Sequence, residues 1–267
     1  MFKNLFLFLS LVSSIIISTF CIKCVADIWI IPVSFIVSFL SCIILWLLFN
    51  IIVTIPISAK KEYNKYSKFF HKLLILDAEF ICFLLNIKIE ISGNQNIAKD
   101  TNFMLIQNHR SFIDPLITFI CLRDYRLSFI SKAENFKKPV VGKFMAKNGC
   151  ISLKREDNRD AVKSVLRAIN ELKSKEFSVG VYPEGSRNKS GKGLLPFKHG
   201  CFKIAQRADV PIIVTTLQGT EKIKKSAIFK RKVVKFEVLS ILDAKNYQNT
   251  EEISKACENI MLENLDK

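Results

Sequence analysis

The sequence predicts an α/β domain, with a mainly parallel sheet covered by helices, preceded by two N-terminal transmembrane or membrane-associated helices. The first observation is a pair of uncharged, largely apolar runs at residues 4–22 and 28–59. The second is an alternation of patterns, in which strand-like runs at residues 102–107 and 178–182 flank a helical pattern between residues 158 and 174. Such alternation favours parallel strands with helices on the faces of the sheet.

The two uncharged runs predict a membrane anchor over residues 1–59. Residues 4–22 lie between Lys3 and Lys23, and a helix of that length reaches about 28 Å, close to the thickness of the hydrocarbon core of a bilayer. The second run is long enough to span a bilayer with a tilt. A cleaved secretory signal is the alternative for the first run, but the second run follows at once and no clear cleavage site lies between them.

Basic residues around these runs predict the orientation of the anchor. Lysines cluster directly after the second run, at Lys60, Lys61, Lys65 and Lys68. The connection between the runs carries only Lys23 and Asp27. Because cytoplasmic flanks are enriched in Lys and Arg, we expect both ends of the anchor on the cytoplasmic face of the membrane, and with them the domain of residues 60–267.

The elements of this domain follow from the periodicity of its apolar residues. An apolar stretch at about residues 69–87 predicts a helix that is either buried or lies in the membrane interface, and we favour the interface. Strands are predicted at residues 88–92, 102–107, 178–182, 211–217 and 233–241. Helical spacing relates Val162, Val165, Leu166, Ile169 and Leu172, and also Ile253, Cys257 and Ile260 in a terminal helix. We expect both of these apolar stripes to be core.

His109 and Asp114 are the candidate catalytic pair, in the segment from Asn108 to Asp114. An imidazole can accept a proton at neutral pH, and a neighbouring carboxylate fixes its tautomer and stabilises the imidazolium that forms. A separation of five residues does not bring side chains together on a regular helix, so the spacing suits a turn that runs into a helix. Pro115 fits the first turn of that helix, and the strand of residues 102–107 places His109 at its carboxyl end, where open α/β sheets carry their sites.

A second candidate segment follows the strand of residues 178–182, where Pro183 and Gly185 indicate a turn. Ser186 and Arg187 then present a hydroxyl and a guanidinium, and arginine suits bidentate binding of a phosphate. Lys189, Lys192 and Lys198 add positive charge to the same loop. The segment predicts an anion site, with a solvated basic turn as the alternative.

Together, Asn-His-Arg-Ser-Phe-Ile-Asp and Pro-Glu-Gly-Ser-Arg resemble the signature of the glycerolipid acyltransferase family, which includes 1-acyl-sn-glycerol-3-phosphate acyltransferases. Other stretches are similar to the family's remaining blocks in order: Ser131 to Glu134 with Pro139 and Gly142, Gly149 to Arg155, Phe197 to Gly200, and Val210 to Ile212. The blocks cover about residues 100–217. Ser186 stands where the family often has Thr, and Val214 stands where its fourth block commonly has a second proline.

The resemblance implies transfer of a fatty acyl group from a thioester to the sn-2 hydroxyl of 1-acyl-sn-glycerol 3-phosphate, giving phosphatidic acid. His109 would be the base and Asp114 its orienting carboxylate. Arg187 would hold the acceptor's phosphate with Gly185 and Ser186, helped by Lys154 and Arg155. Glu184 would either steer the acceptor or hold the turn together. The alternatives are another lysophospholipid or glycerol 3-phosphate as acceptor, and a catalytically silent lipid-binding protein.

Charge and cysteine content limit the partners. The chain carries 40 basic and 24 acidic residues, a net charge of +16. No nucleic-acid-binding motif is present, so attraction to an anionic membrane surface is the simpler interpretation. The eight cysteines are mostly scattered, and no His/Cys cluster suggests a metal. We expect no cofactor; acyl-CoA or acyl-ACP is the co-substrate, and acyl carrier protein is a possible partner.

Overall fold

The computed structural model describes residues 2–154, 157–190, 192–225 and 230–265. The chain divides into two compact units, Met1–Ile57 and Ser58–Lys267. This boundary lies two residues before the one predicted from the sequence, because the second apolar run ends as a helix at Thr54 and continues as a short turn.

The first unit is a helical hairpin made of α1 (Phe2–Cys21) and α2 (Ile30–Thr54), joined through a short 3-10 helix, Val25–Trp29. By length and composition, both helices are long and apolar enough to cross a membrane. Most of their large apolar side chains are exposed, among them Phe8, Ile15 and Leu45. A helix that is apolar on all sides is typical of a lipid environment.

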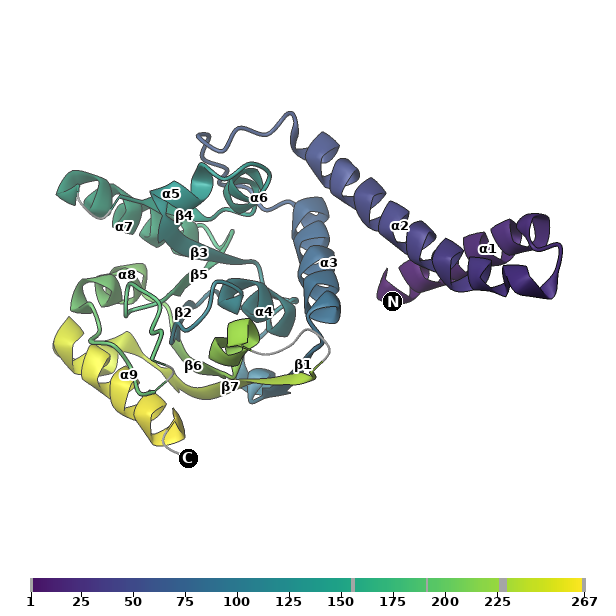
Figure 1. Ribbon diagram of the computed structural model, residues 1–267. Coiled ribbons are helices and arrows are strands. Elements are labelled where there is room, and N and C mark those ends of the chain that lie inside the picture. Colours follow the sequence, from purple (N-terminus) through teal and green to yellow (C-terminus); the bar gives the residue numbers. More distant parts are fainter. Residues whose placement is uncertain (1, 155–156, 191, 226–229, 266–267) are drawn as a thin grey trace. The chain divides into compact units, whose positions relative to one another are not determined.

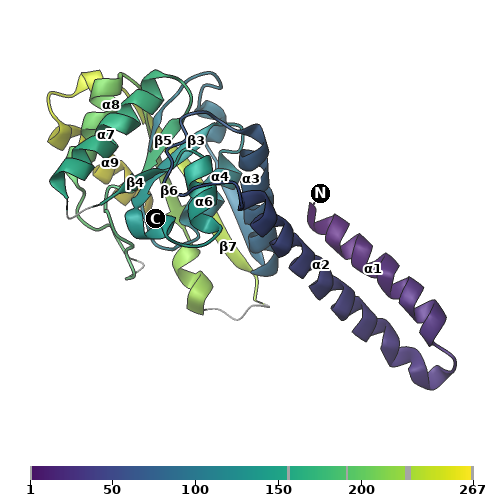
Figure 2. The same cartoon turned by 90° about the horizontal axis from the view of Figure 1, so that it is seen from above.

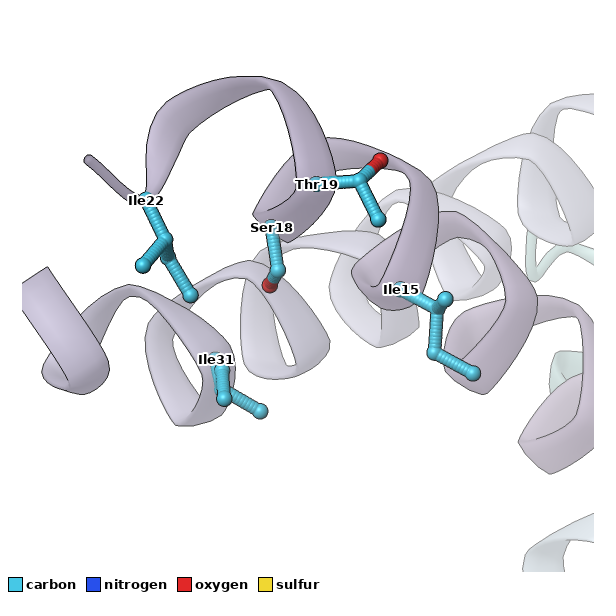
Figure 3. Close-up of a pocket in the computed structure, with 5 residues that line it drawn as sticks. All are labelled: Ile15, Ser18, Thr19, Ile22 and Ile31. Atoms are coloured by element: carbon cyan, nitrogen blue, oxygen red, sulfur yellow. The ribbon is translucent and has the colours of Figure 1, made fainter. Parts of the chain in front are cut away.

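Small side chains form the contact between α1 and α2. Ser10, Ser14 and Ser18 recur every four residues on α1 and are buried, as are Ser34 and Ser38 on α2. The hydroxyl oxygens of Ser14 and Ser34 lie 2.8 Å apart. Small residues allow two apolar helices to approach closely, which a purely apolar environment does not otherwise favour. An open groove of about 430 Å³ lies near the turn of the hairpin (Figure 3), lined by Ile15, Ser18, Thr19, Ile22 and Ile31.

The second unit is built on a seven-stranded sheet in the order β1-β7-β6-β2-β5-β3-β4 (Figure 1). Its strands are β1 (Ile87–Ser92), β2 (Met104–Gln107), β3 (Leu127–Lys132), β4 (Ile151–Leu153), β5 (Ser178–Val181), β6 (Ile212–Gln218) and β7 (Lys232–Leu242). The five strands from β6 to β4 are parallel. β7 pairs antiparallel with β6 and parallel with β1, so β1 and β7, at one end of the sheet, run opposite to the other five strands. The prediction of a mainly parallel sheet is confirmed.

Helices cover both faces of the sheet, as Figures 1 and 2 show. The longer ones are α3 (Lys68–Leu84), α4 (Asp114–Cys121), α7 (Asn158–Lys173) and α9 (Thr250–Leu265); α5 (Ala133–Phe136), α6 (Val141–Lys147) and α8 (Lys203–Ala208) are short. Neighbouring β2 residues serve opposite faces: Leu105 packs in one core with α3 and α4, while Met104 and Ile106 pack in another with α7, α8 and α9. This is the alternation expected of a strand buried on both sides.

Two predictions about helices need correction. The apolar stripe on α7 is only partly core, because Val162 and Leu166 are 59% and 47% exposed, whereas Ile169 and Leu172 are buried. α7 lies on the sheet as an outer layer, so its face toward solvent stays uncovered whatever residues occupy it.

The helix predicted at about residues 69–87 ends at Leu84, and Ile87 already begins β1. Ala78 and Cys82 of this helix, α3, are buried in the sheet's core, so one of its faces matches the buried alternative. Phe69 and Leu84 near its ends are exposed. An interfacial position for α3 stays a prediction.

Candidate active site

The candidate site lies at the carboxyl edge of the two central strands. β2 ends at Gln107 and β5 ends at Val181, and the two strands are parallel neighbours. The loops that follow them therefore leave the same edge of the sheet and meet. The backbone N–H of Asn188 donates to the carbonyl of His109 at 2.7 Å, which joins the two loops directly.

Asp114 holds the imidazole of His109. The distance from His109 Nδ1 to Asp114 Oδ2 is 2.8 Å. Asp114 is fully buried and its Oδ2 also accepts the backbone N–H groups of Arg110 and Ser111, each at 2.7 Å. With Nδ1–H donating to the carboxylate, Nε2 keeps its lone pair free to accept a proton. The imidazole side chain is 18% exposed, so solvent or a substrate can reach it.

The turn between the two residues has the geometry that their spacing predicts. α4 begins at Asp114, with Pro115 in its first turn. The carboxylate folds back from the start of the helix onto the N–H groups of Arg110 and Ser111 in the preceding loop. The five-residue separation brings His109 back over the start of the helix.

Asn108, directly before His109, makes a contact that sequence reasoning missed. Its side-chain Nδ2 donates to the carbonyl of Leu217 at 3.0 Å, and its Oδ1 accepts the N–H of Leu217 at 2.8 Å. The amide thus replaces a peptide group in the hydrogen bonding between β2 and β6. The signal available in the sequence was an amide residue directly after an apolar, strand-like run.

Glu184 is buried and holds two loop segments. Its Oε1 accepts the N–H of His109 at 2.7 Å and its Oε2 accepts the N–H of Leu195 at 2.9 Å. Burial raises the pKa of Glu184, and these two backbone hydrogen bonds act in the opposite direction. Of the two roles considered for Glu184, the contacts match the one that holds the turn together.

The remaining residues of the turn are arranged differently. Gly185 has a φ of +68°, where a side chain is disfavoured, and a Cβ there would lie 2.9 Å from Lys198 Cε. Ser186 and Arg187 are exposed. Asn188 is buried and its Nδ2 donates to the carbonyls of Lys192 and Gly193, which closes the loop.

The structure does not bring Lys154 next to this turn. Lys154 directly follows β4, which is separated from β5 by β3 in the sheet. It is exposed, and its N–H donates to the carboxylate of Asp160 at 2.9 Å. Arg155 lies outside the described residues. Within the described part of the chain, no group of three or more His, Cys, Asp or Glu residues could hold a metal ion.

A tyrosine at this edge was also missed by sequence reasoning. Tyr182 directly follows β5, and its ring stacks on the imidazole of His109 with 4.1 Å between the ring centroids. The strand pattern indicated that Tyr182 follows the end of β5, but it did not state that β5 lies beside β2 in the sheet. In sum, the site offers an oriented imidazole with a free Nε2, and an exposed arginine one loop away.

Comparison with known proteins identifies this arrangement. A family model described as Acyltransferase matches residues 88–218. A chloroplastic 1-acyl-sn-glycerol-3-phosphate acyltransferase of Brassica napus is 38% identical over 162 residues, which cover 60% of this chain and 46% of that protein. The alpha form of the enzyme from Mus musculus is 32% identical, with 63% of this chain and 57% of that protein covered. The chain thus spans about half the length of these curated relatives.

A solved structure agrees with the sequence comparisons. The crystal structure of the 1-acyl-sn-glycerophosphate acyltransferase PlsC from Thermotoga maritima matches with a TM-score of 0.63 and 25% identity. The match covers 73% of this chain and 78% of that one. The fold and the ordered blocks both lie in the matched part, so residues 88–218 of the chain form a domain that matches the acyltransferase family model and has the fold of a solved acyltransferase.

Proposed function

We propose that this protein transfers a fatty acyl group from an acyl thioester to the sn-2 hydroxyl of 1-acyl-sn-glycerol 3-phosphate, giving phosphatidic acid. The single observation that carries the proposal is the imidazole of His109, fixed by Asp114 at 2.8 Å, in a family domain whose relatives are named for this reaction.

In the proposed mechanism, Nε2 of His109 takes the proton of the acceptor hydroxyl as its oxygen attacks the thioester carbonyl. Asp114 stabilises the imidazolium that forms. When the tetrahedral intermediate collapses, the carbon–sulfur bond breaks and the imidazolium returns its proton to the thiolate, so that the free thiol and the new ester leave. General base catalysis of this kind typically contributes about 10²- to 10⁴-fold in rate.

The acceptor's phosphate is assigned to Arg187, whose guanidinium is exposed at the same sheet edge as His109. Gly185 and Ser186 shape the turn that carries it. Lys154 and Arg155 are secondary candidates, which must reach across β3 to contribute. The donor is acyl-CoA or acyl-ACP; both carry phosphate and a thioester, and neither brings a cofactor or metal into the proposed step.

The test is mass-spectrometric identification of products after membranes containing the protein are incubated with mixed lysolipids and both acyl donors. We expect phosphatidic acid carrying the donor's acyl chain at sn-2. His109→Ala should abolish the product, while His199→Ala, at an exposed histidine outside the proposed dyad, should keep it. Acylation of glycerol 3-phosphate or another lysolipid alone would replace the proposed acceptor, and binding of lysolipid without any product would overturn the enzyme.

We further propose that the hairpin of α1 and α2 spans the membrane with both ends, and the acyltransferase domain, in the cytoplasm. Cys21 and Cys24 are exposed at the turn between the helices and supply the probe. A membrane-impermeant maleimide should label them from outside intact cells, whereas a cysteine introduced at an exposed position of the domain, Lys255→Cys on α9, should react only after lysis. Labelling at position 255 in intact cells would reverse the orientation.

A further inference from the structure

The imidazole of the proposed base and the rings of Tyr182 and Phe129 form a continuous stack of three. The rings of His109 and Tyr182 lie 4.1 Å apart with an interplanar angle of 20°. On the other side, the ring of Phe129 stacks on Tyr182 with 5.4 Å between centroids and an interplanar angle of 7°. Tyr182 is therefore held between a core ring and the imidazole.

The sheet builds this stack from three neighbouring strands. Phe129 lies on β3, and its register partner on β5 is Gly180. A Cβ at Gly180 would lie 2.4 Å from Cε1 of Phe129, so only glycine leaves room for that ring. Two residues later in the chain, Tyr182 leaves β5 on the same side as Gly180 and covers the ring of Phe129. His109 then reaches Tyr182 from the end of β2.

The hydroxyl of Tyr182 points away from solvent and is enclosed by the protein. Burial raises the pKa of Tyr182 well above its ordinary value, and the negative charge of Asp114 raises it further, against an opposing interaction with Thr118. Tyr182 is thus a neutral phenol at physiological pH, and it presents the imidazole with the face of an uncharged aromatic ring.

We infer that Tyr182 is a positioning residue for His109, whose stacked ring fixes the plane of the imidazole and stabilises the imidazolium formed during acyl transfer. The hydrogen bond to Asp114 fixes only the position of Nδ1, and the ring could still rotate about the direction of that bond. A flat surface against the imidazole removes this rotation and aims Nε2. A cation over an aromatic face is attracted by the electrons of the ring, which favours the protonated imidazole over the neutral one.

Other charges near the imidazole also act on its protonation. From α4, the carboxylate of Asp114 favours the imidazolium directly. From the loop after β5, Glu184 interacts with His109 and with Arg110. Arg110 opposes a second positive charge, but its guanidinium lies 3.7 Å from Glu221 of the 3-10 helix Thr220–Lys225, which offsets it. Removing the Tyr182 ring leaves these four groups in place, so its own effect is separable from theirs.

The experiment uses full-length protein in lipid nanodiscs and three variants. Tyr182→Phe keeps the ring and removes the hydroxyl, while Tyr182→Leu removes the ring and keeps an apolar side chain. Tyr125→Leu is the matched control, because Tyr125 makes an edge-to-face contact with Phe103 in the core but does not contact the histidine. Each protein is assayed for kcat as a function of pH, and His109 is titrated by NMR. The chain has only three histidines, and the signal missing from His109→Ala assigns the resonance.

We expect Tyr182→Leu to lower kcat about tenfold and to move both the acid limb of the profile and the NMR titration of His109 down by about half a pH unit. Tyr182→Phe should match the wild-type protein in both readouts. Tyr125→Leu should lower the Tm and leave the titration of His109 unchanged. A merely structural role for Tyr182 would lower kcat and Tm but would not move the titration.

The inference rests on the proposed function for its kinetic part, and the two fail separately. A wild-type protein that transfers no acyl group overturns the proposed function, while the NMR titration still tests the stack. An active wild-type protein whose His109 titrates alike in the wild-type and Tyr182→Leu proteins overturns the inference. Loss of activity in Tyr182→Phe would overturn it as well, by assigning the effect to the hydroxyl.

Discussion

The two loops that form the candidate site differ in how completely their polar groups are held. In the loop after β2, Asp114 Oδ2 alone accepts three hydrogen bonds, and Asn108 is fixed on both sides of its amide. In the loop after β5, Glu184 is held as firmly, but Ser186 and Arg187 are exposed. Within the described residues, the guanidinium of Arg187 pairs with no carboxylate.

The firmly held loop after β2 suits a catalytic group, whereas the exposed groups after β5 suit substrate binding. A base must stand in its working geometry before the substrate arrives, because a misplaced proton acceptor loses rate directly. A phosphate-binding cation on the surface gains its partner only on binding, and leaving it unpaired in water costs little. If His109 is the base and Arg187 binds the phosphate, as proposed, the first is held in place before the substrate arrives and the second is left open. Substitutions in the two loops should then have different kinetic signatures.

Asp114→Asn should have the largest effect, a fall in kcat of about 10³- to 10⁴-fold. Asparagine has one side-chain oxygen, and its other end is a donating NH₂ group. When the NH₂ group faces Nδ1, the imidazole must accept there, so its proton moves to Nε2 and the wrong tautomer forms. The measurement is steady-state kinetics with lysophosphatidic acid. Asp124→Asn is the control, since Asp124 is an exposed acid just beyond the end of the same helix. A fall in kcat of less than tenfold for Asp114→Asn would contradict the view that the loop after β2 carries the chemical step.

Arg187→Ala should raise KM for lysophosphatidic acid by about 10- to 100-fold while kcat changes little, because charge-assisted hydrogen bonds contribute about 1.5–3 kcal/mol. Arg187→Lys should recover part of the loss. Arg207→Ala, at an exposed arginine on α8, is the matched control for the loss of one positive charge. A fall in kcat of about 10- to 100-fold at unchanged KM would instead assign Arg187 to the chemical step.

Glu184→Gln should lower kcat about tenfold with a small change in KM. Glutamine can still accept one backbone N–H, but its NH₂ group faces the second donor, so either His109 or Leu195 loses its partner. The comparison of kcat and KM for this variant decides between the two roles of Glu184. A KM effect at constant kcat would assign Glu184 to the acceptor instead of the loop.

The smallest expected effect is a pH dependence of stability. Because the pKa of Glu184 is raised by burial, its protonated form is favoured in the folded state. Its contribution to stability is present below its unfolded pKa, near 4.5, and is lost as pH rises through the higher folded value. The Tm of the wild-type protein relative to Glu184→Gln should fall by about 2–4 °C across this window. The pKa of Glu171 is also raised by burial, but Glu171 is present in both proteins, so its contribution cancels in the difference between their Tm values. A Tm difference between the two proteins that does not change with pH would contradict the raised pKa of Glu184.

The sequence predicted the strand ends that carry the candidate site, and the proximity of His109 and Asp114. An apolar run before His109, and Pro115 after Asp114, were enough to place the pair on a strand-to-helix turn, as the structure has it. The direction of β7 was not predictable, since its sequence pattern is the same for a parallel or an antiparallel strand and only its pairing with β6 and β1 decides it.

Side-chain partners across the sheet were also beyond reach of the pattern. The stack of Tyr182 on His109 depends on β2 and β5 being neighbours, which the order of elements along the chain does not state. The prediction that Val162 belongs to the core was wrong for a related reason. Helical spacing indicates which residues share a face of the helix, but it does not indicate how much of that face the sheet covers.

Asn108 shows how a residue with no proposed role in the chemistry can restrict the evolution of its neighbour, for which such a role is proposed. Its side chain must both donate to and accept from the backbone of Leu217 over a short reach. Aspartate, one base change away in the genetic code, has the same shape but lacks the donor, and glutamine is one carbon too long. We expect substitution at this position to be rejected by selection even in relatives that have changed their lipid acceptor, because the path of the chain into the base depends on it.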